Sequence, residues 1–310
     1  MPGQSNAANA MDFFVGLFKL LRPLEWSKGF GNMAIATIVA AYAFSLQPNI
    51  ALFLAGLVSV SLLWSGLYAL NDWTDRNADK LHPVKKNRPI PSGTVPENFA
   101  LGVAVVLVLV SLAIGFYLGV LFLICLLAML VNQFLYTLPP FSFKKRAIVD
   151  LISGSAINPI FRFYAGWVLL MPAYNAPLLA LLFVVGIQFG GFTLYRLTSH
   201  SVEKKLGYKS SAMVFGEGKV KALAYLAIVA SGLSYFLMTL NGGGFLVLGD
   251  ALGALPFKFF WLGILSLLGL PLYANVLLNP KKADISKVYS LIYLNYVVFV
   301  GGMILLFFWQ

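Results

Sequence analysis

The sequence IALFLAGLVSVSLLWSGLYAL at residues 50–70 is followed directly by NDWTDRNAD at residues 71–79. The first stretch is uncharged, apolar and about 20 residues long, the length that crosses the ~30 Å hydrocarbon core of a bilayer as a helix. The second stretch contains Asp72, Asp75 and Asp79. On a continuing helix these residues fall at about 0°, 300° and 340° around the axis. The sequence therefore predicts three carboxylates on one side of a helix as it leaves a membrane.

Three like charges on one face repel, and protons, basic neighbours or a bound cation relieve that repulsion. Oxygen-only ligands favour a hard ion such as Mg²⁺. We therefore predict that Asp72, Asp75 and Asp79 bind Mg²⁺. A plainer interpretation is a surface network in which Arg76, on the same face, pairs with Asp72 and Asp79. One arginine cannot offset three carboxylates, which favours the metal.

The composition of the chain is that of a membrane protein. Hydrophobic residues make up 60% and charged residues 11% of the 310 residues, and the mean hydropathy is +0.84. A soluble domain typically has about 25% charged residues. The single cysteine, Cys125, lies in an apolar run, so an intramolecular disulfide is excluded.

Apolar runs predict an all-α integral membrane fold with nine transmembrane helices. Gly115 and Gly119 divide the long apolar stretch from 100 to 138 into two of them. Long loops follow the second and sixth spans and short lysine-bearing loops follow the fourth and eighth, which favours two four-helix repeats plus one helix. The expected spans are 30–46, 50–70, 100–118, 120–138, 151–170, 176–195, 221–240, 255–275 and 288–309.

The placement of basic residues supports this topology. With the N-terminus in the cytoplasm, all of the 22 Lys and Arg residues except Arg162 and Lys258 fall on the cytoplasmic side. This bias follows the positive-inside rule and places the C-terminus across the membrane. The net charge of +11 is then a topology signal, and no nucleic acid partner is expected.

Residues 1–29 are expected to form an amphipathic segment at the surface of the lipid bilayer, and residues 30–310 a single transmembrane domain. Basic residues lie near the apolar ones in the first segment and suit anionic headgroups. The apolar residues that recur there at helical spacing are Phe13, Phe14, Leu17, Phe18 and Leu21.

The pattern Asn71-Asp72-x-x-Asp75-x-x-x-Asp79, followed by His82-Pro83-x-Lys85-x-x-Arg88-Pro89-Ile90-x-Ser92-Gly93, resembles the first aspartate-rich motif of the UbiA superfamily of intramembrane prenyltransferases. The likeness extends to Arg22-Pro23-x-x-Trp26-x-Lys28, to Tyr136-Thr137-x-Pro139-Pro140 with Lys144, and to Arg162 before Ala165-Gly166. The resemblance implies a transferase domain of nine helices around a central cavity. It implies a cavity open to lipid for a polyprenyl chain and capped by cytoplasmic loops, with Mg²⁺-dependent attack on a polyprenyl diphosphate.

The chemistry of a diphosphate explains the residue types. Carboxylates bind a diphosphate only through bridging cations, and basic side chains must neutralise the remaining charge. An arginine inside a span is costly enough to be a functional candidate. We expect catalytic roles for Asp72, Asp75, Asp79, Arg162 and Glu203. We expect substrate contacts from Asn71, Lys85, Arg88, Tyr136, Lys144, Lys145, Arg196 and Lys204.

Several of these residues have plainer explanations. The lysines and Arg88 also fit ordinary positive-inside bias. Arg162 is also placed to pair with Asp150 or to cap carbonyl groups. His82 precedes a proline and is expected to be structural rather than a base.

The loop after the sixth expected span departs from the family pattern. The superfamily usually carries a second aspartate motif there, which holds a second Mg²⁺. Here residues 195–209 contain no aspartate, and Glu203 is their only acid. Arg196 and three lysines make the loop basic, which suits direct charge-assisted hydrogen bonds to phosphate. We therefore expect one metal ion rather than two.

Two reactions fit this site. The leading interpretation is transfer of a polyprenyl group from polyprenyl diphosphate to a small acceptor, with release of diphosphate. The alternative is transfer of phosphoribose from phosphoribosyl diphosphate to a polyprenyl phosphate. The His-Pro-x-Lys-x-x-Arg-Pro-Ile motif, combined with a loop that carries Arg196 and Glu203 in place of the second aspartates, is similar to the branch of the family with that reaction. An inactive lipid-phosphate-binding relative or a transporter is less favoured, because transporter sites usually lie near the bilayer midplane.

Overall fold

The structure is a computed structural model that describes residues 3–80, 85–198, 200–205, 207–240, 254–279 and 285–309. Helices account for most of these residues. Within the described ranges there is no β-strand, and the pairing of Arg146 with Lys209 is an isolated bridge. The predicted all-α class is confirmed.

The helices follow one another along the chain in an order that matches the predicted apolar runs. The α-helices are α1 (Gly3–Leu21), α2 (Trp26–Phe44), α3 (Ile50–Lys80), α4 (Glu97–Leu118), α5 (Val120–Thr137), α6 (Val149–Ile152), α7 (Asn158–Trp167), α8 (Leu178–Thr198), α9 (His200–Lys205), α10 (Ser211–Phe215), α11 (Glu217–Thr239), α12 (Phe260–Leu268), α13 (Ala274–Leu278) and α14 (Ile285–Phe308). Short 3₁₀ turns are η1 (Pro23–Glu25), η2 (Lys85–Asn87), η3 (Phe143–Lys145), η5 (Phe257–Phe259) and η6 (Leu270–Tyr273), and η4 (Ser153–Ile157) is a π-helical turn.

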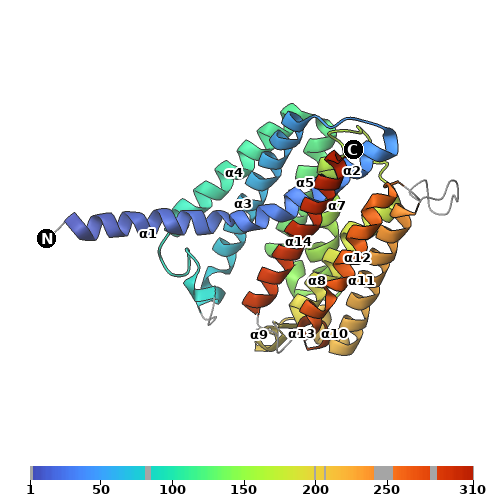
Figure 1. The fold of residues 1–310 in the computed structure, drawn as a ribbon. Coiled ribbons are helices and arrows are strands. Elements are labelled where there is room, and N and C mark those ends of the chain that lie inside the picture. Colours follow the sequence, from blue (N-terminus) through green and yellow to red (C-terminus); the bar gives the residue numbers. More distant parts are fainter. Residues whose placement is uncertain are drawn as a thin grey trace.

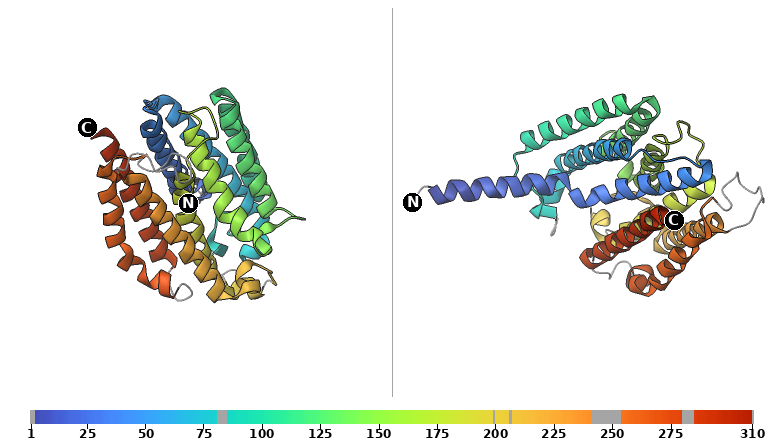
Figure 2. Two further views of the ribbon diagram at one scale, coloured as in Figure 1. Left: turned by 90° about the vertical axis from the view of Figure 1, so that its right-hand side faces the viewer. Right: turned by 45° about the horizontal axis from the view of Figure 1, so that its top comes forward.

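The long helices lie side by side in one bundle (Figures 1 and 2). Helix α3 packs along α4 and α8 packs along α11, while α2 contacts both α7 and α14. Helix α5 contacts α4 and α7. Segments from the two halves of the chain are therefore joined around α2 and α7.

Five described helices are long and apolar enough to cross a membrane: Ile50–Asn77 of α3, α4, α5, Leu178–Leu197 of α8, and α11. Helix α14 contains a shorter apolar part, Tyr293–Phe308, and the eighth expected span has the apolar segment Phe257–Leu268. The total of nine spans and the two repeats remain predictions. The predicted break between α4 and α5 is confirmed at Gly119, whose φ of 122° favours glycine.

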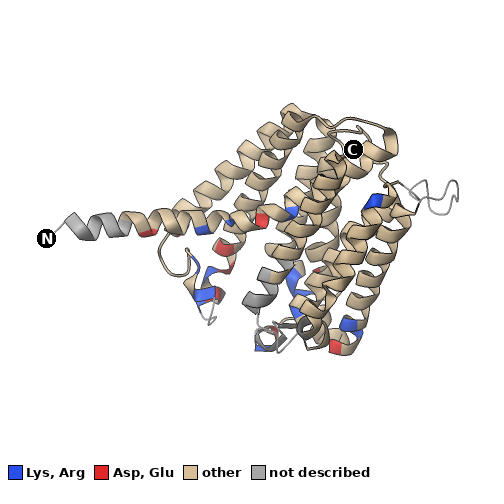
Figure 3. Ribbon diagram, viewed as in Figure 1, with Lys and Arg blue, Asp and Glu red and all other residues tan. Residues whose placement is uncertain are grey.

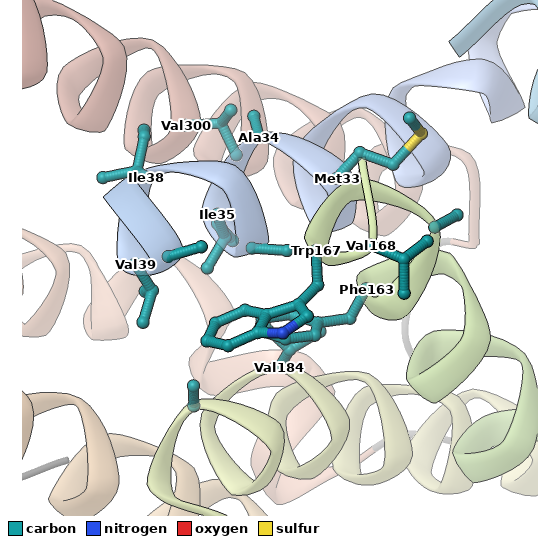
Figure 4. Packing of buried hydrophobic residues seen from close by; sticks show 14 of the residues in the cluster. Met33, Ala34, Ile35, Ile38, Val39, Phe163, Trp167, Val168, Val184 and Val300 are labelled. Carbon is teal, nitrogen blue, oxygen red and sulfur yellow. The ribbon is translucent and has the colours of Figure 1, made fainter. Parts of the chain in front are cut away.

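The main apolar core lies where α2, α7, α8 and α14 meet. Phe163 and Trp167 of α7 stack with ring centroids 5.9 Å apart. Both are buried against Ile35 of α2 and Val184 of α8 (Figure 4). At Gly166 an added Cβ atom would lie 2.4 Å from the backbone oxygen of Met33, so the backbones of α7 and α2 touch there. This contact fixes the position of α7, the helix that carries Arg162.

Helix α1 extends sideways from the bundle (Figure 1). Its Leu20 is buried with Ile90 and Val95, and α1 contacts α3. Phe14 and Phe18 are exposed. An apolar face left exposed beside membrane-crossing helices is what an interfacial helix presents. The division into residues 1–29 and 30–310 stays a prediction.

Candidate active site

The charged residues of the described chain gather around the end of the bundle to which α3 extends beyond its apolar part, and the opposite end has few (Figure 3). Two connecting segments contact α3 at this end: residues 85–96 after α3 and residues 138–148 after α5. The segment after α8 lies beside the second of these, because the backbone N–H of Lys209 donates to the carbonyl of Lys145. The candidate site is formed by side chains of α3 and of these segments.

Asp72 and Asp79 lie on one face of α3, as predicted, and share one basic group. Arg88 Nη1 donates to Asp72 Oδ1 at 2.9 Å and to Asp79 Oδ2 at 2.8 Å. Arg22 Nη2 also bonds Asp72 Oδ1, at 2.5 Å, and Lys85 Nζ lies 4.0 Å from Asp79 Oδ1. Both carboxylates are buried, so Arg88 from a loop neutralises two acids inside the protein.

Asp75 has a different partner. Lys144 Nζ donates to Asp75 Oδ1 at 2.6 Å, which joins α3 to the segment after α5. Asn71 Nδ2 donates weakly to Asp75 Oδ2 at 3.4 Å, and Asn71 Oδ1 accepts from Thr137 Oγ1 at 3.2 Å. Lys144 is buried despite its charge. Asp75 is therefore held toward the segment after α5 rather than toward Arg88.

The carboxylates fit a hard cation in chemistry, but no group of three or more His, Cys, Asp or Glu side chains in the described ranges is arranged to hold a metal ion. Arg88 Nη1 lies between Asp72 and Asp79, 2.9 and 2.8 Å from their oxygens. These are hydrogen-bond distances, and Mg²⁺ binds oxygen at a shorter distance of ~2.0–2.1 Å. Burial raises the pKa of Asp79, and Asp75 and Asp72 add to this against the opposing effect of Arg88 and Lys85. An ionised Asp79 thus favours an added positive charge, and the Mg²⁺ site stays a prediction.

Arg196, near the end of α8, and the segment that follows α8 form a separate buried network. Arg196 Nη2 bonds Glu203 Oε1 at 2.7 Å and lies 3.6 Å from Asp150 Oδ2. Ser210 Oγ donates to Glu203 Oε2 at 2.5 Å, so both oxygens of this carboxylate are occupied. Asp150 is fully buried and accepts from the backbone N–H and the hydroxyl of Ser211. Glu203 is thereby held as part of the structure.

The two networks meet at Lys144. Its side chain bonds Asp75, while its backbone carbonyl accepts from Arg196 Nη2 at 3.0 Å. The backbone N–H of Lys209 donates to the carbonyl of Lys145 at 3.0 Å. The segments after α5 and α8 are therefore tied together beside the carboxylates.

Arg162 lies deeper in the bundle. Its guanidinium carbon is 3.8 Å from the ring centroid of Trp64 on α3, and the side chain is buried. The alternative pairing with Asp150 is wrong, because Asp150 is bonded to Ser211 and lies beside Arg196. The alternative role of Arg76 is also wrong, because Arg76 pairs with Glu97.

Other predicted residues lie at the edge of these networks. Tyr136 accepts a hydrogen bond from Arg196 Nη1 at 3.2 Å. Lys145 Nζ lies 5.2 Å from the ring centroid of Tyr208, and Lys204 is exposed on α9. His82 lies outside the described residues.

Arg22 and Asp150 were not among the predicted site residues. Arg22 belongs to the quoted Arg-Pro-x-x-Trp-x-Lys pattern, and that likeness could have identified it. Asp150 is an acid directly before an expected span, which is a signal of a buried partner.

A bundle with five described helices long and apolar enough to cross a membrane, and with paired carboxylates and basic side chains at one end, defines the class of α-helical membrane proteins with a charged site at one end of the bundle. A model of the UbiA prenyltransferase family matches residues 32–267. The chain therefore belongs to the UbiA prenyltransferase family, whose members are integral membrane proteins. The predicted family is confirmed.

Relatives of known name differ in their reactions. The chain is 30% identical over 227 residues to a decaprenyl-phosphate phosphoribosyltransferase of Mycolicibacterium smegmatis, covering 68% of each chain. It is 29% identical over 239 residues to a 4-hydroxybenzoate octaprenyltransferase of Marinomonas sp., covering 74% of each. A solved UbiA homologue from Archaeoglobus fulgidus, bound to GPP and Mg²⁺, has a TM-score of 0.72 at 18% identity and covers 94% of this chain and 99% of that one. This structural likeness shows a shared fold.

Proposed function

We propose that this protein transfers a phosphoribosyl group from phosphoribosyl diphosphate to a polyprenyl phosphate, with release of diphosphate. The sequence patterns alone favour prenyl transfer. The state of Glu203 reverses that order, because both of its oxygens are bonded within the protein and it offers no carboxylate for a second cation. The named phosphoribosyltransferase relatives support the same choice.

The proposed reaction brings phosphate groups from two substrates to one site. The sugar donor carries a diphosphate and a further phosphate, and the lipid acceptor carries its own. Direct binding of phosphate requires basic side chains. The described site supplies Arg22, Lys85, Arg88 and Lys144 from three separate segments, and only Lys85 and Arg88 share one. This distribution suits several phosphate groups better than one diphosphate.

Mg²⁺ would be held by Asp72 and Asp79, with Asp75 beside them, and when bound it would neutralise charge on the leaving diphosphate. Arg88 and Lys144, which now neutralise these carboxylates, are the basic groups nearest to that diphosphate. With the carboxylates neutralised in this way, Arg88 and Lys144 would be the side chains that bind the diphosphate oxygens. Only one cation site is proposed, since Glu203 is already paired.

The bond changes need no base from the protein. An anionic oxygen of the lipid phosphate attacks carbon 1 of the ribose. The bond from that carbon to the diphosphate oxygen breaks, and its electron pair leaves with the diphosphate. The nucleophile is already ionised at neutral pH, so no proton is removed. This is consistent with a site whose described acids are all paired with basic groups or hydroxyls.

A second candidate is prenyl transfer from a polyprenyl diphosphate to a small acceptor. The solved homologue bound to GPP and Mg²⁺ favours it, because that protein has the same fold. In prenyl transfer, the diphosphate of the prenyl donor would bind at the same carboxylates and arginines.

One assay separates the two reactions. The purified protein in lipid nanodiscs is given Mg²⁺ with phosphoribosyl diphosphate and polyprenyl phosphate, or with a prenyl diphosphate and an aromatic acceptor. Released diphosphate and the masses of the lipid products are measured. We expect a phosphoribosylated lipid in the first mixture. Product only in the second mixture would replace the proposal with prenyl transfer.

A further inference from the structure

A row of aromatic and acidic residues follows one face of α3 from the core to the end of the bundle. Trp64, Tyr68 and Asp72 are spaced four residues apart, so they lie above one another over about 12 Å. A guanidinium lies over each of them. Arg162 is 3.8 Å from the Trp64 ring centroid, Arg22 is 4.8 Å from that of Tyr68, and Arg22 and Arg88 bond Asp72.

Arg162 is the innermost of these cations and the one without a carboxylate partner among the described residues. Its side chain is 5% exposed, and its Nε has no hydrogen-bond acceptor. An uncompensated charge inside a membrane helix is costly. Contact with the Trp64 ring offsets part of that cost. The part of the cost that the ring does not offset indicates that Arg162 binds an anion.

The surroundings of Arg162 add a second cation but little negative charge. Lys28 lies close enough for its charge to interact with that of Arg162. The carboxylate beside Lys28 is Glu25, at 2.5 Å, and Glu25 also accepts from the hydroxyl of Tyr68 at 3.1 Å. Glu25 is therefore shared, and Arg162 and Lys28 together exceed the acid available to them in the described chain.

We propose that Arg162, assisted by Lys28, binds the phosphate of the polyprenyl phosphate acceptor. This proposal rests on the proposed function, and it gives the position of the nucleophile of that reaction, the lipid phosphate. A lipid phosphate has its chain in the hydrocarbon, whereas the sugar donor arrives from water. Arg162 is on α7, whose backbone touches α2 inside the bundle, and Asp72 lies about two helical turns beyond Trp64 toward the end of α3 at Lys80.

The row on α3 then matches the geometry of the reaction. A displacement at carbon 1 needs the attacking and leaving oxygens on opposite sides of that carbon. The diphosphate at Asp72 and Asp79 and the lipid phosphate at Arg162 leave the ribose between them, beside Tyr68. The attacking oxygen forms its bond from the Trp64 side, and the diphosphate leaves toward Arg88.

The test compares Arg162→Met, Arg162→Lys and a control, Arg76→Met, in lipid nanodiscs. Arg76 is an arginine of α3 one turn beyond Asp72, and it pairs with Glu97 rather than with a carboxylate of the row. We expect Arg162→Met to raise the KM for polyprenyl phosphate about tenfold or more while the KM for phosphoribosyl diphosphate changes by less than about twofold. Arg162→Lys should recover part of the loss, and Arg76→Met should behave as wild type.

Direct binding keeps this test independent of turnover. Native mass spectrometry compares the binding of polyprenyl phosphate with that of the uncharged polyprenol. The wild type should prefer the phosphate, and Arg162→Met should lose that preference; this result stands even where the wild type turns over prenyl diphosphate instead. A raised KM for the sugar donor alone would assign Arg162 to the sugar's phosphate and overturn the proposal. An unchanged lipid preference would also overturn it. Lys28→Met provides the same comparison where Arg162→Met fails to fold.

Discussion

Two clusters in this protein place one arginine between two carboxylates, and they differ in what surrounds the arginine. Arg88 comes from a loop, its side chain is 26% exposed, and it bridges Asp72 and Asp79. Arg196 comes from α8, is 9% exposed, and lies between Glu203 and Asp150. The first arginine is partly exposed and is therefore accessible to a ligand. The second is enclosed by partners that are themselves bonded.

Ion pairs of similar composition therefore serve different purposes according to how deeply they are buried. Removing one member of a fully buried pair leaves an uncompensated charge. A partly exposed pair contributes less, because water replaces the lost partner. Changes at Asp79 and Arg88 should therefore affect activity, and changes at Arg196 should affect stability.

The largest effect is expected for Asp79→Asn. Turnover should fall about 10²–10³-fold, the range seen when one electrostatic contact to a transition state is removed. Thermal stability should stay equal or rise, because burial raises the pKa of Asp79 and its ionised form therefore costs stability at neutral pH. Diphosphate release and thermal unfolding in detergent measure the two effects. A large loss of stability would show that Asp79 is structural.

The next largest effect is expected for Arg196→Met. This change leaves Glu203 and Asp150 buried without their cation and should lower the free energy of unfolding by about 3–5 kcal/mol. Arg88→Met is the matched control and should cost much less. Thermal unfolding of both variants makes the comparison. Equal losses of stability in the two variants would mean that the clusters around Arg88 and Arg196 contribute equally to folding.

A moderate effect is expected for Arg88→Gln. Loss of a charged donor should raise the KM for the diphosphate substrate about tenfold, consistent with the ~1.5–3 kcal/mol of a hydrogen bond to a charged group. Folding should be retained, because Arg22 still pairs with Asp72. Steady-state kinetics at varied concentrations of the diphosphate donor measure this KM. Unchanged kinetics would limit Arg88 to neutralising the carboxylates.

The smallest effect is expected from pH. The pKa of Asp79 is raised, so its proton is favoured in the folded protein, and that contribution to stability is lost as the pH rises through the folded pKa. Acidification from about pH 7 to pH 5 should therefore raise the Mg²⁺ concentration needed for half-maximal turnover a few-fold. Mg²⁺ titrations at both pH values measure this. A requirement that is the same at both would remove Asp79 from the metal site.

Much of the fold was predictable because bilayer crossing demands long apolar runs. The helices α3, α4, α5, α8 and α11 were found this way. The π-helical turn η4 was not, since the stretch from Ser153 to Pro159 is rich in turn-forming residues and its conformation depends on packing.

The candidate site was predictable where it is local in sequence. Asp72, Asp79 and Arg88 lie within 17 residues of one another, and helical spacing brought the two acids together. The pairing of Asp75 with Lys144 spans 69 residues and depends on how α5 packs against α3. The alternative pairings, of Arg76 with Asp72 and Asp79 and of Arg162 with Asp150, were wrong because residues distant in sequence compete for each charge.

Helix α1 ends at Leu21, and the next residue, Arg22, bonds Asp72 directly. Arg22 has a φ of 49°, so the chain turns sharply between a helix that leans away from the bundle and an arginine in the site. A helix resting on the membrane surface, as proposed for α1, would fix the height of that arginine relative to the lipid headgroups. The thickness and surface charge of the host membrane would then tune the carboxylates through a single residue.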